Sequence, residues 1–235
     1  MSIAEDLKKA WRNTAAALLP QDCFLCAAPS GQSLVCPSCV AGLPRLAAER
    51  CPLCALPTPA ANICGACLKQ APHFDATLAA FRYEFPLDRL IQSLKYAHRL
   101  ASADFLGKAL AQLAAPLHPD LIVPVPLAAA RLAQRGFNQA LELARPLARA
   151  LGAPLEISRI RRCRDTTPQA SLPWKERKNN IRHAFECEID LSGKTVLLVD
   201  DVMTTGATLD ELARVLKTQG AVRVENCVLA RALKD

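Results

Sequence analysis

One stretch near the end of the chain, residues 196–209, constrains the fold more than any other. It opens with the apolar run 196–199, which is typical of a strand buried on both faces of a parallel sheet. The adjacent acids Asp200 and Asp201 follow, where we expect this strand to end. A short loop then leads into a helical pattern, so the stretch predicts a strand, a loop and a helix of an α/β fold.

The loop of this stretch has the features of a phosphate site. Its residues are small or hydroxylic: Thr204, Thr205, Gly206, Ala207 and Thr208. A loop that opens a helix leaves backbone N–H groups free beside the positive end of the helix dipole. The two acids before it can accept hydrogen bonds from sugar hydroxyls, so the stretch predicts a pocket for a ribose 5-phosphate group. The alternative is an ordinary strand–turn–helix junction with acids at the helix start.

The same stretch resembles the phosphoribosyl diphosphate (PRPP) signature of type I phosphoribosyltransferases. By that resemblance, Asp200 and Asp201 hold the ribose hydroxyls and residues 204–208 wrap the 5-phosphate. Purine-salvage members of this class often carry an acid at the position of Thr204, where it can serve the incoming base. Threonine cannot do so, which disfavours purine salvage. A Walker loop is excluded, because no Gly-Lys-Ser/Thr follows.

Four Cys-x-x-Cys pairs near the start of the chain form an internal repeat. The eight cysteines are Cys23, Cys26, Cys36, Cys39, Cys51, Cys54, Cys64 and Cys67. Each cysteine of the first set recurs 28 positions later in the second. Two such pairs complete a tetrahedral Zn²⁺ site, so the spacing predicts two closed, structural four-cysteine sites. The repeat favours pairing within each half, and a crossed pairing of the same cysteines stays open.

Disulfides and redox chemistry are the rival interpretations of these cysteines. Disulfides fit poorly with a chain in which we find no secretion signal, and redox Cys-x-x-Cys motifs usually occur singly. The cysteine segment is too short and too poor in apolar residues to build its own core, so zinc must stabilise it. Cys163, Cys187 and Cys227 lie outside the pattern and are expected to act as small apolar residues.

Basic side chains outside the signature are candidate phosphate ligands. Lys95 lies at the end of a predicted helix and is either a phosphate ligand or a solvated lysine. Arg131 and Arg135 follow a strand that ends in prolines, and we expect their segment to open the helix that runs to Leu151. Arginines at a helix start repel its dipole, which favours an anion between them over a solvated basic turn.

A second basic segment lies between Arg159 and Arg182, with the polar, turn-prone residues 165–172 in its middle. Such a loop could close over a diphosphate, with Arg177 as one ligand. It could instead follow a nucleic-acid backbone, or form a solvated surface hairpin. The net charge of +7 suits an anionic partner but does not choose between these readings.

The order of these features resembles the ComF family (competence protein F, also called GntX-like) over nearly the whole chain. The cysteine module precedes Val-Pro-Val-Pro at 123–126, Arg-Gly-Phe-Asn-Gln at 135–139, and then the PRPP signature. The resemblance implies a zinc-binding module joined to a phosphoribosyltransferase-like domain. It also implies, for some members, handling of incoming single-stranded DNA in natural transformation beside DNA-uptake proteins, and for others a role in nutrient use.

The sequence therefore predicts three parts of an α/β protein. They are an N-terminal helix (1–20), a double zinc ribbon (21–70) and a type I phosphoribosyltransferase fold (73–235), a parallel-sheet core with flanking helices. The longest apolar runs are far short of a membrane span, and the N-terminus lacks a convincing signal peptide, so a cytoplasmic location is expected.

Two functions remain open at this stage. In the first, the protein binds PRPP or a related ribose phosphate with Mg²⁺ and transfers the phosphoribosyl group to an unidentified acceptor. Asp200 and Asp201 then stabilise charge on the ribose while Arg131, Arg135 and the 162–177 loop neutralise the diphosphate. In the second, the fold serves as a PRPP sensor or as a binding protein for single-stranded DNA or a partner. The sequence leaves the acceptor, the retention of activity, the pathway and the oligomeric state open, with a homodimer as one option.

Overall fold

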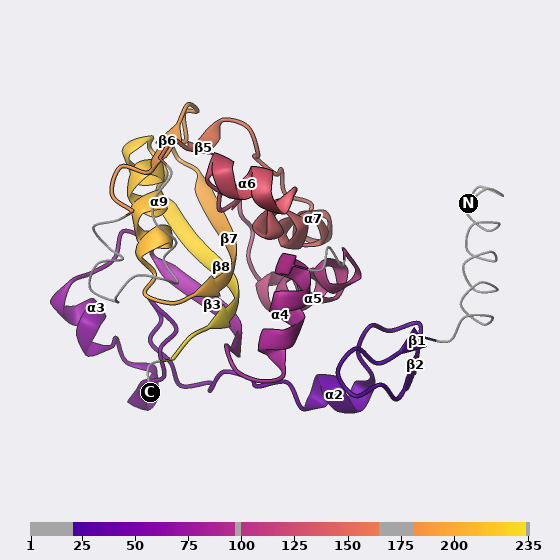
Figure 1. The fold of residues 1–235 in the computed structure, drawn as a ribbon. Coiled ribbons are helices and arrows are strands. Elements are labelled where there is room, and N and C mark those ends of the chain that lie inside the picture. Colours follow the sequence, from indigo (N-terminus) through magenta and orange to yellow (C-terminus); the bar gives the residue numbers. More distant parts are fainter. Residues whose placement is uncertain (1–20, 97–99, 165–180, 234–235) are drawn as a thin grey trace. The chain divides into compact units, whose positions relative to one another are not determined.

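The computed structural model describes residues 21–96, 100–164 and 181–233 (Figure 1). The chain divides into two compact units, residues 1–44 and 45–235. The first four-cysteine cluster lies in the first unit, and the second cluster lies in the same unit as the large sheet. The expected N-terminal helix, Arg177 and residues 165–172 lie outside the described residues.

The first unit contains a small hairpin and a short helix. These are β1 (Gln21–Asp22), β2 (Pro29–Gly31) and α2 (Pro37–Ala41). The two strands pair antiparallel. Among residues 21–44, the part of this unit that the structure describes, the buried apolar side chains are Cys23, Val35, Cys36 and Leu43.

The second unit is an α/β domain preceded by the second cysteine cluster. In chain order its elements are η1 (Pro59–Ala61), α3 (Gly65–Lys69), β3 (Ala76–Arg82), α4 (Leu87–Tyr96), α5 (Leu100–Ala114), β4 (Leu121–Pro124), α6 (Ala129–Arg135), α7 (Gln139–Leu151), β5 (Ile160–Arg162), β6 (Phe185–Cys187), β7 (Thr195–Met203), α9 (Ala207–Thr218) and β8 (Arg223–Arg231). The described residues include no helix that is both long and apolar enough to cross a bilayer.

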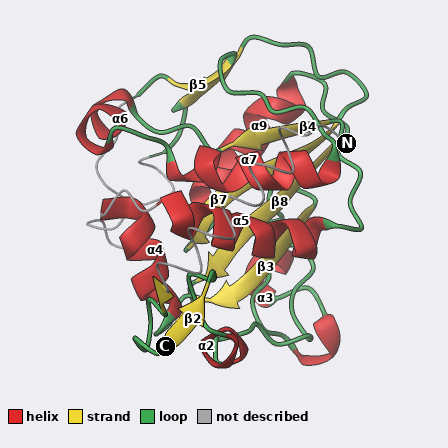
Figure 2. Cartoon of the chain, turned by 90° about the vertical axis from the view of Figure 1, so that its right-hand side faces the viewer, coloured by secondary structure: helices red, strands yellow, loops and turns green. Residues whose placement is uncertain are grey.

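A four-stranded parallel sheet forms the core of this unit, in the order β3-β8-β7-β4. The central strands β7 and β8 are almost wholly buried, which explains their continuous apolar runs. The helices α5 and α7 pack together on one face, where α4 joins α5, and α9 contacts β8 and β6 on the other (Figures 1 and 2). This confirms the predicted parallel core with flanking helices.

The topology creates a switch point between β4 and β7. The chain leaves β4 toward α6 and α7, and it leaves β7 toward α9. Figure 1 shows α6 and α7 on one side of β7 and α9 on the other. In open parallel sheets, a crevice forms outside the carboxyl ends of two such strands, and ligands bind there. The acid pair Asp200 and Asp201 lies near the carboxyl end of β7, at this position.

Two details differ from the sequence expectations. The strand β7 does not end before the acids but continues to Met203, because its parallel pairing with β8 extends to Met203 and Arg231. Arg131 and Arg135 do not open α7 but lie in the separate helix α6. Gly136, in the left-handed conformation, ends α6, and Asn138 accepts a hydrogen bond from the Ala140 N–H to start α7.

Gly107 allows α5 and α7 to approach closely. A Cβ atom at this position would lie 2.3 Å from Pro146 Cγ and 2.9 Å from the Leu143 carbonyl oxygen. Alanine gains about 1 kcal/mol of helix propensity over glycine, but overpacking costs about 1–3 kcal/mol. We therefore expect Gly107→Ala to lower the free energy of unfolding in urea. Asp104→Ala, on the same helix and exposed, is the control, and a stabilised Gly107→Ala protein would contradict the expected clash.

Candidate functional site

A cavity of about 270 Å³ opens at the switch point. It holds four cationic side chains, two carboxyl groups and two hydroxyl side chains of the loop after β7. The charged and polar lining residues are Tyr83, Lys95, Arg131, Arg135, Gln139, Arg162, Asp200, Asp201, Thr204 and Thr208. An excess of cations around paired acids suits a ligand that carries both phosphate groups and hydroxyls.

Lys95 reaches this cavity from α4 and pairs with Asp201. The Lys95 Nζ and Asp201 Oδ2 atoms are 2.5 Å apart, and the two side chains are 21% and 7% exposed. Burial disfavours the ammonium of Lys95, but the Asp201 carboxylate outweighs burial and raises the pKa of Lys95 above its ordinary value. Lys95 is therefore a charged group of the site and not a solvated lysine.

The two adjacent acids have opposite ionisation tendencies. Burial and the neighbouring Asp201 carboxylate raise the pKa of Asp200 well above its ordinary value. Burial would also raise the pKa of Asp201, but attraction to Lys95 lowers it below its ordinary value. The backbone N–H of Asp201 donates to Asp200 Oδ1 and that of Val202 donates to Asp201 Oδ1, both at 2.8 Å, which fixes the carboxyl groups. Two carboxyl groups forced together in this way favour a ligand that supplies hydrogen-bond donors.

The motif at 135–139 is organised by hydrogen bonds within the site. Arg135 Nη1 donates to Gln139 Oε1 at 2.6 Å, and Asn138 Nδ2 donates to the Val125 carbonyl at 3.0 Å. Asn138 thus ties the start of α7 to the segment after β4, and Gln139 orients Arg135. Motif residues that hold one arginine in place are consistent with a binding role for that arginine.

The loop between β7 and α9 has two sides. Thr204 and Thr208 line the cavity with the acids, whereas Thr205, Gly206 and Ala207 line a second cavity of about 330 Å³. The Thr205 hydroxyl accepts a hydrogen bond from the Ala207 N–H at 3.2 Å, and Gly206 takes a left-handed conformation with φ of 82°. The loop therefore opens α9, as its sequence predicts.

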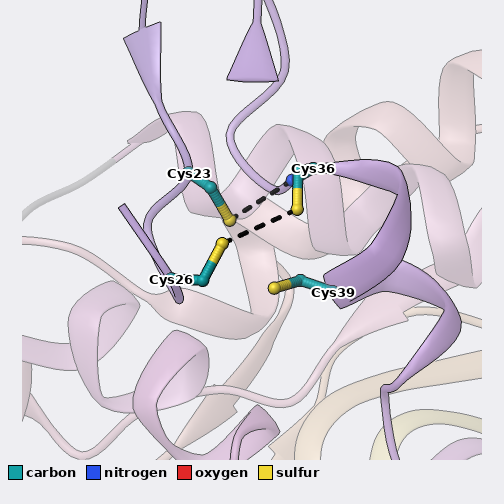
Figure 3. A group of neighbouring side chains, drawn as sticks. All are labelled: Cys23, Cys26, Cys36 and Cys39. Atoms are coloured by element: carbon teal, nitrogen blue, oxygen red, sulfur yellow. Dashed lines mark hydrogen bonds between the residues drawn. The ribbon is translucent and has the colours of Figure 1, made fainter. Parts of the chain in front are cut away.

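The eight repeated cysteines form two separate clusters. Within each cluster all four sulfur atoms lie within 4.8 Å of one another, and the sulfur atoms of the first cluster point toward a common centre (Figure 3). A tetrahedral zinc site with Zn–S bonds of about 2.3 Å requires sulfur–sulfur distances of about 3.8 Å. Cys26 and Cys36 Sγ atoms are 3.8 Å apart, and those of Cys54 and Cys64 are 3.5 Å apart. The sulfur arrangement fits two zinc ions, and the pairing is sequential, not crossed.

The internal repeat extends to the backbone of each cluster. Ala27 and Ala55, 28 positions apart, share a φ of 58°. The Ala27 N–H donates to the Cys23 carbonyl at 2.8 Å, and the Ala55 N–H donates to the Cys51 carbonyl at 2.9 Å. Both clusters thus have the turn of a zinc knuckle.

Backbone N–H donors also favour the thiolate form of Cys23, which is the form that binds metal. The Cys36 N–H donates to Cys23 Sγ at 3.3 Å. Burial opposes ionisation of Cys23, but such backbone donors outweigh it and lower the pKa of Cys23 to about 6. Of the three cysteines outside the clusters, Cys227 is fully buried, as expected, whereas Cys163 is exposed and Cys187 is half-buried.

Comparison with known families matches both parts of the chain. Residues 98–235 match the phosphoribosyl transferase domain, and residues 14–68 match the double zinc ribbon domain. The "DNA utilization protein YhgH" of Salmonella typhi is 36% identical over 222 residues, which cover 90% of each chain. "Competence protein F" of Haemophilus influenzae is 35% identical over 177 residues, covering 69% of this chain and 76% of the relative. The chain belongs to the ComF family.

Solved structures resembling this ComF family member include a purine phosphoribosyltransferase from Pyrococcus horikoshii. It is 27% identical, covers 55% of this chain and 71% of that one, and gives a TM-score of 0.37. The type I phosphoribosyltransferase fold and the double zinc ribbon expected from the sequence are both present in this ComF protein.

The structure brings together most of the site residues singled out in the ComF sequence. Seven of them share the cavity at the switch point: Lys95, Arg131, Arg135, Asp200, Asp201, Thr204 and Thr208. Arg177 lies outside the described residues. Tyr83 and Gln139 also line the cavity, although the sequence did not indicate them as site residues. Gln139 lies within the family motif, which could have indicated it, but nothing local in the sequence marks Tyr83.

A side chain at position 206 is expected to destabilise this ComF protein. A Cβ atom there would lie 2.6 Å from Met203 Cε, in a conformation that side chains rarely adopt. We expect Gly206→Ala to lower the free energy of unfolding in urea by about 2 kcal/mol. Gly193→Ala is the matched control, because Gly193 has a φ of 73° but open space around it. Equal losses in the two variants would show that the Met203 contact contributes nothing.

Proposed function

We propose that the switch-point cavity binds PRPP with Mg²⁺ and that the protein transfers its phosphoribosyl group to an acceptor. The observation that carries this proposal is the meeting of Asp200 and Asp201 with Lys95, Arg131 and Arg135 in one cavity. Carboxyl groups suit the ribose hydroxyls, and cations suit a diphosphate. The match of residues 98–235 to the phosphoribosyl transferase domain supports the same assignment.

Each side of the cavity would hold a different part of the ligand. The loop 204–208 at the start of α9 would hold the 5-phosphate through Thr204, Thr208 and free backbone N–H groups. Asp200 and Asp201 would accept hydrogen bonds from the ribose hydroxyls. The arginines of α6 would face the diphosphate, whose own oxygens would provide most ligands of Mg²⁺.

The proposed reaction is a displacement at the anomeric carbon of the ribose. The bond from this carbon to the diphosphate oxygen breaks, and a bond forms to a nucleophilic atom of the acceptor. Positive charge develops on the ribose during this step, as in glycoside cleavage. The carboxylate of Asp201 stabilises that charge, while Arg131 and Arg135 stabilise the leaving diphosphate.

Calorimetric titration of PRPP with Mg²⁺ tests the binding step. We expect saturable binding by the wild type and a loss of at least about tenfold in affinity for Asp200→Asn, because an NH₂ donor replaces one carboxyl oxygen that would accept from the ribose hydroxyls. Asp104→Asn, on the exposed surface of α5, is the control. A folded, zinc-loaded wild type that does not bind PRPP would refute the proposal. Binding without diphosphate release in a screen of acceptors would favour the non-catalytic, PRPP-sensing alternative.

A second candidate function is the binding of single-stranded DNA, favoured by the names of relatives that refer to DNA utilization and competence. The end of β5 and the residues directly after it would provide the surface, where Arg161 and Arg164 are exposed. Arg162 is unsuitable as a probe, because it lines the PRPP cavity.

Charge reversal at Arg161 and Arg164 distinguishes the two functions. Phosphate contacts release counterions, so DNA binding should weaken steeply with added salt, and Arg161→Glu/Arg164→Glu should weaken it further while PRPP affinity stays unchanged. DNA affinity that is insensitive to both salt and charge reversal would remove this surface from consideration. Arg145→Glu/Arg149→Glu, at two exposed arginines on α7, controls for the same loss of net charge.

A further inference from the structure

Arg231, at the end of β8, is a buried arginine with unusual partners. Its side chain is 2% exposed, yet no carboxylate within the described part of the chain pairs with it. Within the described residues, its guanidinium donates to four backbone carbonyls. The acceptors are Cys54 O at 2.8 Å, Met203 O at 2.9 Å, Ala232 O at 2.8 Å and Thr204 O.

These acceptors belong to two different structures. Met203 ends β7 and Thr204 begins the loop that would hold the 5-phosphate, whereas Cys54 belongs to the second four-cysteine cluster. Nε donates to the cluster, whereas Nη1 donates to the loop, so one rigid guanidinium plane connects the two. The position of the loop backbone is thereby tied to the position of Cys54.

The loop and the cluster face a common cavity. This cavity, of about 330 Å³, is lined by Cys54 and Cys67 on the cluster side and by Thr205 and Gly206 on the loop side. Arg231 forms part of its wall. Phe74 and Met203 also line this cavity, and Arg231 adds hydrogen bonds to both the loop and the cluster.

Charge also couples Arg231 to metal at the cluster. Four thiolates around one Zn²⁺ carry a net charge of about −2, and a coordinating thiol is deprotonated. A buried guanidinium without a carboxylate partner needs such a negative neighbour. Loss of the metal would remove both the fixed position of Cys54 and this compensating charge.

We propose that the second four-cysteine cluster, when it holds zinc, positions the phosphate loop through Arg231, whereas the first cluster does not. Arg231 is thus a positioning residue of the ribose-phosphate site. The expected effect of the second cluster on PRPP affinity rests on the proposed function. Its effect on the order of the loop can be measured without any ligand.

Selective removal of each zinc site tests the coupling. Cys64→Ser/Cys67→Ser removes two ligands of the second cluster, and Cys36→Ser/Cys39→Ser removes the equivalent ligands of the first, so each full-length protein should retain one zinc instead of two. Hydrogen exchange of peptides covering 203–209 should speed up by at least about tenfold only in the first of these proteins. PRPP affinity should fall by at least about tenfold in the same protein only. Equal effects in both proteins, or unchanged exchange of the loop, would overturn the proposal.

Arg231→Met identifies the link itself. It retains much of the aliphatic stem but removes the donors, so we expect a similar loss of PRPP affinity. In the protein that also carries Cys64→Ser/Cys67→Ser, Arg231→Met should lower PRPP affinity by less than a further factor of about two, because the link between cluster and loop is already lost. If the factors by which the two changes lower PRPP affinity multiply, the cluster acts on the loop through other contacts, and the role of Arg231 is overturned. As a control, slow hydrogen exchange of the β4 backbone in every variant would show that the sheet is folded.

The outcomes separate this inference from the proposed function. If the wild type fails to bind PRPP, the proposed function fails, and loop exchange alone decides the coupling. If the wild type binds PRPP but loses neither affinity nor loop protection with the second cluster, the coupling fails and the proposed function stands.

Discussion

Removing zinc is expected to unfold residues 21–44 while the parallel sheet stays folded. Residues 21–44 contain a two-stranded hairpin, a five-residue helix and few buried apolar side chains, of which Cys23 and Cys36 are themselves ligands of the predicted metal. Zinc binding supplies about 10–16 kcal/mol in zinc-finger peptides, far more than such a core can. Hydrogen exchange measured peptide by peptide, before and after chelation, should show faster exchange in residues 21–44.

The control for this experiment is the central strand β7, whose exchange should remain slow after chelation because it is buried between two neighbours. Cys36→Ser/Cys39→Ser should reproduce the effect on residues 21–44 without chelator, which excludes an action of the chelator on the sheet. Protection of residues 21–44 that survives full loss of metal would show that this unit folds without it.

Substituting the two adjacent acids is expected to change stability in opposite directions. Asp200→Asn removes a carboxyl group that burial and Asp201 disfavour in its charged form, so we expect the melting temperature to rise by about 2–4 °C at pH 7. Asp201→Asn leaves Lys95 without its carboxylate at 2.5 Å, so we expect a fall of similar or greater size. Both variants should lose PRPP affinity.

The pH dependence gives an independent check on Asp200. Because its pKa is raised on folding, the folded state binds more protons than the unfolded state above the ordinary carboxyl pKa. This group therefore makes stability fall as pH rises from that value to the raised one. Melting curves of Asp200→Asn over the same pH range should lack that decline. A wild type and variant with parallel pH profiles would contradict the raised pKa, and Asp104→Asn should resemble the wild type.

Much of the fold and the site follows from local sequence patterns. The apolar run of β7, the acids and the loop before α9 are contiguous, so their order alone indicates a strand and a phosphate-type loop. The 28-residue cysteine repeat likewise predicts both clusters. Because a zinc knuckle is a local structure, pattern and geometry agree there.

The parts that the sequence could not provide are contacts between distant residues. Lys95 and Asp201 are far apart in the chain, and only the packing of α4 decides that the lysine reaches the acids. The sequence pattern also predicts that β7 ends where the acids begin. This is wrong, because parallel pairing with β8 keeps Asp200 and Asp201 within the strand. Arg231 carries no motif, and its role depends on carbonyl groups that only the folded chain assembles.

The matching turns at Ala27 and Ala55 give this molecule a built-in comparison. The two metal sites share ligand type, spacing and knuckle geometry, yet one belongs to a small unit and the other to the large α/β unit. Any difference in the rate at which the two sites exchange isotopically labelled zinc therefore measures what the surrounding protein adds to an otherwise equal set of ligands.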